Sequence, residues 1–311
     1  MPIEQTLPEW VAAEERGTMN MLRFMTFISL QLGRPLSRLV LYGIAAYFFL
    51  FAPTPRRHMR KYLRHALRRN PSFVDRFRLL LSFASTIHDR VYLLNDRYDL
   101  FDISLEGVEF VAAHVDRGEG VFLMGAHMGS FDIVRATGMR QPGLQVTMAM
   151  YEENAHKINA MLCAINPRLA PDVIPLGTID SMLQIQARLA AGACVGVLGD
   201  RTIGADALQR VDFLGAPAWF PTGAMRAAAM LRYPVVFMVG LYRGSNRYQI
   251  VFQELADFSQ TTHADRGNAV RVAIERYAGL LARQCTVNPY NWFNFFDFWQ
   301  EPPAPTSIGK A

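Results

Sequence analysis

A histidine and an aspartate that could act together stand in the stretch Gly125-Ala-His-Met-Gly-Ser-Phe-Asp132. His127 directly follows the apolar run 121–126, and Asp132 falls where a helix is expected to begin. Residues five positions apart point about 140° away from each other on a continuous helix, but a strand-to-helix turn through Gly129 can bring them together. A carboxylate bound to one ring nitrogen raises the basicity of the other. The stretch therefore predicts a general base, His127, oriented by Asp132, that takes a proton from a hydroxyl or an amine.

The spacing of this pair does not single it out. With 7 His and 27 acidic residues in 311, chance supplies about 0.6 pairs of the same spacing, and His114 with Glu119 is one such pair. His114 lies in a predicted helix, whereas His127 ends a predicted strand. Position therefore favours His127, although a structural histidine satisfied by core groups remains the alternative on these residues alone.

The elements that would position this pair begin at about residue 121, where short apolar runs alternate with helical stretches. Strands are predicted at 121–126, 145–150, 172–176, 194–199, 235–241 and 248–255, and helices at 131–140, 154–165, 179–191, 223–232 and 266–284. This alternation predicts an α/β fold with a largely parallel central sheet covered by helices on both faces. Residues before about 110 show no such strands and are expected to be helical. The predicted organisation is an N-terminal, membrane-associated helical region (1–110) and an α/β core (111–311).

In such sheets, functional groups gather in the loops that follow the carboxyl ends of the strands. This rule directs attention to residues 126–132 and 199–204. Asp200 and Arg201 leave the predicted strand 194–199 at the same edge as His127 if the sheet is parallel. Arg201 could bind a phosphate of a substrate, because a guanidinium matches two phosphate oxygens at once. The alternative is a surface ion pair between neighbouring loops.

The composition and charge exclude several classes of protein. Hydrophobic residues make up 51% of the chain and charged residues 19%, which argues against a disordered or tail-like binder. The net charge of +5 is concentrated in the segment 56–78, which holds nine Lys or Arg and one acid. A nucleic-acid binder would usually show aromatic stacking residues or a reading helix near its charge, whereas this basic segment follows an apolar run, so no nucleic acid is expected as a partner.

The apolar run 39–53, which precedes the basic segment, contains no charged residue. It is shorter than the roughly 20 residues of an upright transmembrane helix, yet more apolar than most core helices. Lys and Arg beside an apolar segment mark the cytoplasmic side of a membrane and attract anionic lipid. The combination predicts membrane association, either spanning or lying on the surface. The alternative is a buried core helix followed by a solvated basic helix.

The remaining chemically active residues do not form recognisable sites. The three cysteines, Cys163, Cys194 and Cys285, stand far apart and are expected to be reduced, buried thiols. The seven histidines are scattered without ligand spacing, so no metal site is predicted. The chain also lacks a phosphate-binding glycine loop of either common type.

The stretch AHMGSFD after an apolar strand resembles the H-x4-D/E signature of the lysophospholipid acyltransferase superfamily. More narrowly, it is similar to the bacterial branch that includes the late acyltransferases of lipid A biosynthesis. Later blocks of that branch resemble Val195-Gly-Val-Leu-Gly-Asp-Arg201, Val211-Asp-Phe-Leu-Gly215 and Pro221-Thr-Gly-Ala-Met-Arg226. The resemblance covers about residues 20–299. In one respect the chain departs from it, because the lipid A enzymes usually carry Glu where this chain has Asp132.

The resemblance implies an acyltransferase that moves a fatty acyl chain from a thioester of acyl carrier protein or coenzyme A to a hydroxyl or amine of a lipid or glycolipid acceptor. It implies the cytoplasmic face of a bacterial inner membrane as the location, and no resident cofactor. His127 would be the general base and Asp132 its partner, with direct transfer rather than an acyl-enzyme on Ser130. The rival interpretations are a membrane-associated esterase or thioesterase, in which water replaces the acceptor, and a non-catalytic lipid-binding protein.

The resemblance also implies weaker candidates for substrate binding. Arg226 could share the phosphate-binding task of Arg201, and Gly215 is expected in a tight turn of the substrate region. The C-terminal stretch from Asn288 to Trp299 resembles a group of relatives linked to aryl polyene or unusual-lipid biosynthesis. Within it lies the aromatic run from Trp292 to Trp299. It could line an acyl channel, rest at a membrane interface or simply dock on the core.

Overall fold

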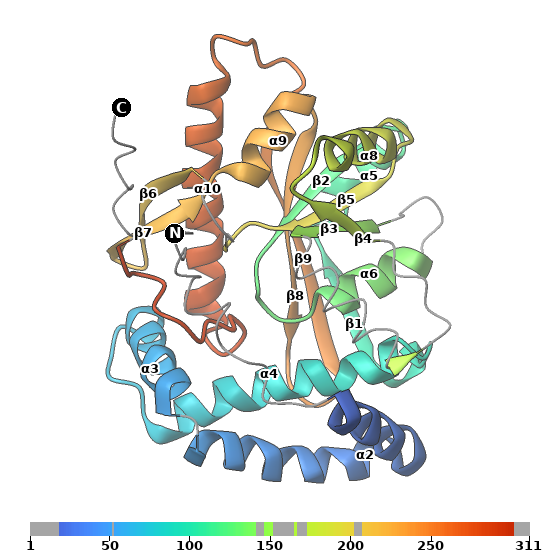
Figure 1. Cartoon of the computed structure of the whole chain (residues 1–311), viewed down its shortest axis with the longest axis vertical. Helices are drawn as coiled ribbons and strands as arrows, with labels where there is room; N and C mark the ends of the chain where they lie inside the picture. Colours follow the sequence, from blue (N-terminus) through green and yellow to red (C-terminus); the bar gives the residue numbers. More distant parts are fainter. Residues whose placement is uncertain are drawn as a thin grey trace, which may run out of the picture.

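The computed structural model describes residues 19–51, 53–140, 146–151, 165–166, 173–201 and 207–301. Within these residues, a seven-stranded sheet runs through the molecule in the order β1-β9-β8-β2-β5-β3-β4 (Figure 1). Its strands are β1 (Asp102–Glu106), β2 (Val121–Gly125), β3 (Val146–Tyr151), β4 (Val173–Leu176), β5 (Cys194–Leu198), β8 (Pro234–Tyr242) and β9 (Arg247–Asp257). Neighbouring strands pair in parallel except for β8 with β9, so the predicted α/β fold with a largely parallel sheet is confirmed.

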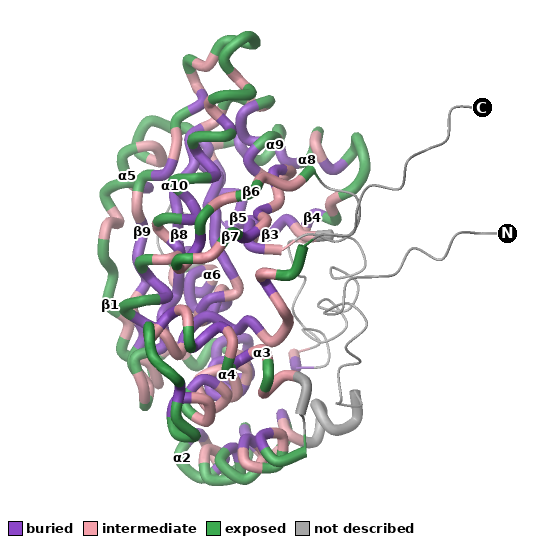
Figure 2. Tube along the Cα trace, turned by 90° about the vertical axis from the view of Figure 1, so that its left-hand side faces the viewer, coloured by how far each residue is buried: buried purple, intermediate pink, exposed green. Residues whose placement is uncertain are grey.

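Residues along the central strands alternate between two apolar clusters, because successive side chains of a strand point to opposite faces. In β2, Phe122 and Met124 belong to one cluster, and Val121 and Leu123 belong to the other. Such a sheet must be covered on both sides. Figure 2 shows that the central strands of the sheet are buried in the middle of the molecule.

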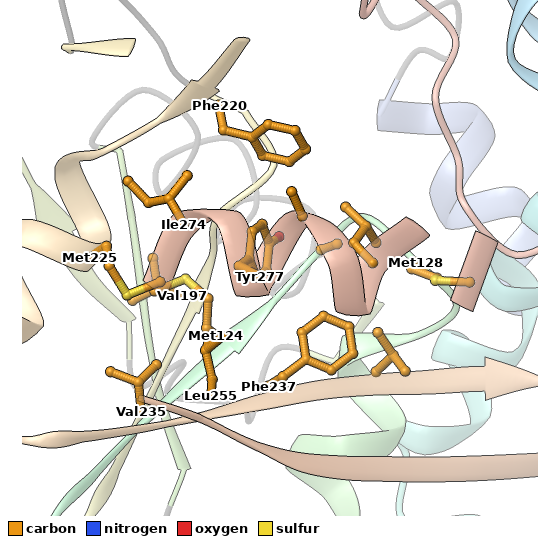
Figure 3. Packing of buried hydrophobic residues seen from close by; sticks show 14 of the residues in the cluster. Met124, Met128, Val197, Phe220, Met225, Val235, Phe237, Leu255, Ile274 and Tyr277 are labelled. Atoms are coloured by element: carbon orange, nitrogen blue, oxygen red, sulfur yellow. The ribbon is translucent and has the colours of Figure 1, made fainter. Parts of the chain in front are cut away.

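Helices cover the two faces of the sheet, as predicted. The first face packs against α3 (Pro53–Leu67), α8 (Ile179–Ala190), α9 (Gly223–Leu231) and α10 (Arg266–Val287). The second packs against α5 (Glu109–Val115) and α6 (Phe131–Arg140). Figure 3 shows α10 lying over the sheet, with Tyr277 between Phe220 and Phe237. The Tyr277 hydroxyl donates to the Gly125 carbonyl at 2.7 Å, which ties α10 to the end of β2.

Two further helices, α2 (Met19–Phe51) and α4 (Phe73–Leu93), lie together across one end of the molecule (Figure 1). Gly33, with φ 73° and ψ 168°, breaks the regular helical geometry of α2. Ser72 caps α4, and the Asp75 side chain completes a capping box by binding back to the Ser72 backbone. Gly33 thus accounts for the bend in α2, and Ser72 with Asp75 accounts for the start of α4.

The region before residue 110 differs from the prediction, because it contributes β1 to the edge of the sheet. This strand pairs with β9 through residues Asp102 to Glu106. Four of its five residues are exposed, so the sequence carries no apolar run that would mark it. The N-terminal region is thus not purely helical, and it shares the sheet with the core.

A separate antiparallel hairpin, β6 (Leu208–Phe213) and β7 (Ala216–Pro221), was also not predicted. Its two-residue turn consists of Leu214 and Gly215, both with positive φ, which is the turn geometry that suits a tight hairpin. The predicted helix 154–165 lies outside the described residues except for its last position.

Candidate active site

The site forms where β2 and β5 end side by side. These strands are parallel neighbours, with Gly125 opposite Leu198. His127 and Asp200 each follow two residues after that pair, so both side chains leave the same edge of the sheet. His127 Nδ1 and Asp200 Oδ1 lie 2.8 Å apart. The backbone N–H of His127 also faces the two carboxylate oxygens, at 3.2 and 3.1 Å. The register of two strands thus brings together residues 73 positions apart.

The charge of Asp200 fixes the tautomer of His127. The Asp200 side chain is fully buried, and burial by itself would raise its pKa. The charge and hydrogen bond of His127, the charge of Arg201 and the N–H of Trp292 instead hold the pKa of this carboxyl well below its usual range. An ionised carboxylate only accepts hydrogen bonds, so Nδ1 must carry the proton. The lone pair of Nε2 is then the basic position.

The electrostatics keep the imidazole neutral near pH 7. Loss of water around the ring lowers the pKa of His127, and the positive charge of Arg201 lowers it further. Asp200 opposes both effects, but the net pKa lies below the ordinary value of 6.5. The side chain is 35% exposed, so the ring is accessible from outside. A neutral and accessible imidazole with an oriented tautomer can act as a general base.

The loop after His127 is shaped by a close contact of two glycines. Gly129 has φ 67°, and a Cβ at this position would lie 2.0 Å from the Gly240 carbonyl oxygen. The next residue, Ser130, donates its N–H to that same oxygen at 2.7 Å. Glycine is therefore required at position 129 both for the backbone conformation and for the approach to β8.

Asp132 does not orient His127 as predicted, because the hydrogen bond of the His127 ring goes to Asp200. The Asp132 carboxylate instead accepts a hydrogen bond from Arg90 Nε on α4 at 2.6 Å. The physical reason is the path of the loop. Met128 packs in the cluster on the first face of the sheet, but Ile133 packs in the cluster on the second, so the chain carries Asp132 across to α4.

The second pair with the same spacing does form its hydrogen bond. His114 Nδ1 lies 2.9 Å from Glu119 Oε2, and Arg117 donates to the same oxygen at 2.8 Å. This cluster is on the surface, where Glu119 is about half exposed. A histidine and a carboxylate at this spacing thus form a contact on the surface, where they are not part of a buried site.

Arg201 lies beside the His127–Asp200 pair rather than in a surface ion pair. One guanidinium nitrogen, Nη2, donates to the Phe293 carbonyl at 2.6 Å, and the guanidinium carbon lies 5.0 Å from the centre of the Phe296 ring. Its buried Nε has no hydrogen-bond partner among the residues that the structure describes. Burial lowers the pKa of Arg201, and the neighbouring Asp200 opposes that change. A cation held by one carbonyl and one ring retains donors for a ligand.

The other predicted binding residues lie on separate elements. Gly215 occupies the turn of the β6–β7 hairpin with φ 81°, which explains the glycine there without a ligand. Arg226 is exposed in α9, and its backbone N–H bonds to the Thr222 carbonyl at 2.9 Å. The structure does not bring either residue into the hydrogen-bonded group of His127 and Asp200 within the described part of the chain. Their part in substrate binding stays a prediction.

Two contributors to the site were missed by sequence reasoning. Trp292 donates its indole N–H to Asp200 Oδ2 at 2.9 Å. Asn291 receives the N–H of Gly129 on its backbone carbonyl at 2.8 Å. The aromatic run near the end of the chain was a visible signal, but nothing in the sequence indicated which strand end it would meet.

An apolar cavity of about 250 Å³ opens on the first face of the sheet. Its walls come from both strands that carry the site and from two helices, and include Phe122, Val197, Met182, Ile185, Ala224 and Ala227. Among the described residues, no three His, Cys, Asp or Glu side chains come together as metal ligands would. The lining of the cavity is thus mainly apolar.

These features define an α/β protein in which an imidazole is held by a buried carboxylate at the carboxyl edge of parallel strands. Comparison with protein families gives the narrower class: residues 16–301 match the profile of the bacterial lipid A biosynthesis acyltransferases. The chain belongs to this family and is an acyltransferase, with an acyl donor and a lipid acceptor as its substrates. Among curated proteins, no significant match is found.

The two carboxylates are expected to respond differently to substitution. In Asp200→Asn an amide N–H would face Nδ1, forcing the proton to Nε2, so kcat/KM should fall roughly 10³-fold or more. In Asp132→Asn the pairing with Arg90 weakens, which should cost about 1–3 kcal/mol of unfolding free energy but less than about ten-fold in kcat/KM. Thioester turnover and thermal unfolding of both variants check this. The opposite ranking in activity would restore Asp132 as the partner of His127.

The pH dependence of activity should reflect the lowered pKa of His127. Because the neutral ring is the active form, kcat/KM should be constant near pH 7 and fall as the pH drops, with a midpoint below 6.5. Arg201→Gln removes a positive charge that favours the neutral ring, so the midpoint should move to higher pH. Initial rates of thiol release from palmitoyl-coenzyme A across pH 5–8 measure it. A wild-type midpoint at or above 6.5 would contradict the electrostatic account.

Proposed function

We propose that the protein transfers a fatty acyl chain directly from a thioester of acyl carrier protein or coenzyme A to a hydroxyl or amine of a lipid or glycolipid. The observation that supports this most is the 2.8 Å contact between His127 Nδ1 and the buried Asp200 carboxylate. It leaves Nε2 as a base on the accessible side of the ring. His127 is the general base, and Asp200 takes the orienting role.

The reaction follows from this arrangement. The acceptor hydroxyl or amine attacks the thioester carbonyl as Nε2 of His127 takes its proton. Asp200 stays ionised and stabilises the imidazolium that forms. Collapse of the tetrahedral intermediate breaks the carbon–sulfur bond, and the imidazolium returns the proton to the departing thiolate. The products are the acylated lipid and a free thiol, and His127 is neutral again.

Direct transfer is favoured over an acyl-enzyme because no described hydroxyl or thiol is placed as a nucleophile beside His127. Ser130 is buried, and its hydroxyl has no hydrogen-bond partner among the described residues. Burial raises the pKa of Cys194 to about 12, and burial also raises the pKa of Cys285. Cys163 lies outside the described residues. The acceptor itself therefore supplies the nucleophile.

The surroundings of the base support an anionic and a hydrocarbon part in the substrates. Arg201 carries a positive charge immediately after Asp200, and we assign it to a phosphate of the donor or of the acceptor, with Arg226 as a more distant helper. The apolar cavity shares Phe122 and Val197 with the strands that carry the site. Part of the acyl chain would lie there, where apolar side chains replace water.

Helix α2 supports a membrane-associated enzyme, because it turns several polar side chains inward and many large apolar side chains outward. The side chains that it turns inward include Ser29 and Ser37, both fully buried. Outward it presents large apolar residues, which are Phe27, Leu30, Leu32, Leu36, Leu39, Val40, Tyr42, Tyr47, Leu50 and Phe51. Figure 2 shows these exposed segments along the outer side of α2, at the bottom of the view. A patch of this extent on a protein surface marks an interaction site.

The two charged side chains of α2 that the structure describes are directed toward the protein. Between residues 25 and 51 only Arg34 and Arg38 are charged. Arg34 binds both oxygens of the buried Asp89 at 2.8 and 2.9 Å, and Arg38 donates to the Tyr242 hydroxyl at 2.9 Å. Between residues 25 and 51 the large exposed side chains are thus mainly apolar, while the helix that follows exposes several Arg residues. Apolar and basic surfaces side by side fit the interface of an anionic membrane.

Among the described residues, no single helix combines the length and hydropathy needed to cross a bilayer. One pair of consecutive helices, Met25–Phe51 with Pro55–Leu67, meets these requirements jointly but is bent by 97°. We propose that the enzyme is held at the cytoplasmic face of a bacterial inner membrane through α2.

Membrane binding should depend on the outer face of α2. Leu50→Glu places a charge on that face and should weaken binding to phosphatidylethanolamine–phosphatidylglycerol vesicles roughly ten-fold or more. Leu183→Glu on α8 is the matched control, since both leucines are 59% exposed. Co-sedimentation with vesicles measures the difference. Equal binding of the two variants would contradict the role of α2.

The transfer reaction is tested by product analysis. With labelled palmitoyl-coenzyme A and bacterial lipid extract, mass spectrometry should detect an acylated lipid that disappears in His127→Ala. His114→Ala should change little, because that histidine belongs to the surface cluster. Free fatty acid as the sole product, with or without lipid, would establish an esterase or thioesterase instead. Unchanged transfer by His127→Ala would remove the proposed mechanism.

A further inference from the structure

The segment at the end of the described chain returns to the active site and joins it through its backbone. Trp292 forms an antiparallel bridge with Met128. On either side of this bridge, Phe293 N–H donates to the His127 carbonyl at 2.8 Å, and Gly129 N–H donates to the Asn291 carbonyl at 2.8 Å. The loop that carries His127 is therefore held between β8 and this segment.

The side chain of Asn291 anchors the segment to the sheet. Its carbonyl oxygen accepts the Tyr242 backbone N–H at 2.7 Å, and its amide donates to the Tyr242 carbonyl at 3.1 Å. Both bonds are buried and both involve the last residue of β8. The position of Trp292 relative to the sheet is thereby fixed.

The indole of Trp292 is fully buried and surrounded by other rings. The centres of the Tyr62, Phe213 and Phe298 rings lie 4.9, 5.4 and 4.9 Å from it, each in an edge-to-face arrangement. These rings come from α3, β6 and the terminal segment itself. Packing from three elements fixes the direction of the indole N–H, which is the only polar group of the side chain.

The indole N–H of Trp292 and the ring of His127 bind different oxygens of the Asp200 carboxylate. Trp292 Nε1 donates to Oδ2 at 2.9 Å, while Oδ1 faces the His127 ring at 2.8 Å. A donor on Oδ2 prevents the carboxylate from rotating and withdraws negative charge from it. Less charge on the carboxylate stabilises the imidazolium less, and this favours the neutral, basic ring.

We propose that Trp292 is a positioning residue for the acyl-transfer reaction, acting through Asp200 to hold His127 in its basic tautomer and to keep it neutral. This inference rests on the proposed role of His127 as the base. It makes the terminal aromatic segment part of the active site rather than a docked tail.

The groups around the carboxylate leave His127 as the one that titrates near neutral pH among the described residues. Arg201 remains a cation. Tyr277 and Cys285, both on α10, contribute electrostatically at Asp200 but stay neutral, because burial raises the pKa of each. A change in the pH profile after substitution of Trp292 can therefore be assigned to His127.

The test is Trp292→Phe, with Trp299→Phe as the matched control. Trp299 lies in the same segment, and its indole N–H donates to the Phe213 carbonyl at 3.2 Å rather than to the site. In Trp292→Phe we expect kcat/KM for palmitoyl-coenzyme A at pH 7 to fall about ten-fold, and the acid midpoint to move to higher pH. In Trp299→Phe the midpoint should not move.

A second measurement does not depend on turnover. The rate at which diethyl pyrocarbonate modifies His127, followed by peptide mass spectrometry as a function of pH, reports the fraction of neutral ring. Its midpoint should also rise in Trp292→Phe and stay unchanged in Trp299→Phe. In an Asp200→Asn background, adding Trp292→Phe should cause little further loss, because its target is already altered.

Loss of activity by an equal factor at every pH, with both midpoints unmoved, would show a purely structural role and overturn the inference. If Trp292→Phe does not fold, benzothienylalanine at position 292 retains the shape without the N–H and decides by the same two measurements. The proposed function is tested separately. If His127→Ala retains full transfer activity, then His127 is not the base and the proposed function fails.

Discussion

The structure depends on one buried negative charge, the carboxylate of Asp200. An isolated charge without water is costly, so it must be met by hydrogen-bond donors and positive charge. The donors come from the loop after β2 and from the segment around Trp292, and the positive charge comes from Arg201. Three parts of the chain that are distant in sequence are thereby held at one edge of the sheet. The same contacts that satisfy the charge also orient the His127 ring.

A second buried charge, the carboxylate of Asp89, lies on α4, the helix whose Arg90 binds Asp132. Asp89 is fully buried and is bound by Arg34 and by the Tyr248 hydroxyl at 2.8 Å. Burial alone would raise its pKa, but the nearby His88 ring, 3.6 Å away, and the hydrogen bonds of Arg34 and Tyr248 hold the pKa below its usual value. The ion pair fixes Arg34 of α2 on the inner side, where Ser29 and Ser37 are also buried, followed farther along the helix by Leu41 and Phe49. Large apolar side chains of α2 also lie on the outside, and they form the surface proposed for the membrane.

Two histidine–carboxylate pairs have the same spacing in the sequence, yet only one of them forms a hydrogen bond within the pair. His114 and Glu119 form the contact on the surface, whereas His127 and Asp132 do not share one, since the chain crosses the sheet edge between them. The segments rich in apolar residues were predicted well, including six strands of the sheet. The polar edge strand β1 and the β6–β7 hairpin carried no such pattern and were missed.

The sequence by itself determined the α/β class, the strand that ends at His127, the basic segment after the apolar run and the family to which the chain belongs. These features depend on local periodicity and on short motifs. Only the tertiary structure decided that Asp200 rather than Asp132 binds the imidazole, and that Trp292 donates its indole N–H to Asp200. The order and register of strands determine which residues meet across a sheet, and both result from packing of the whole chain rather than from any local pattern.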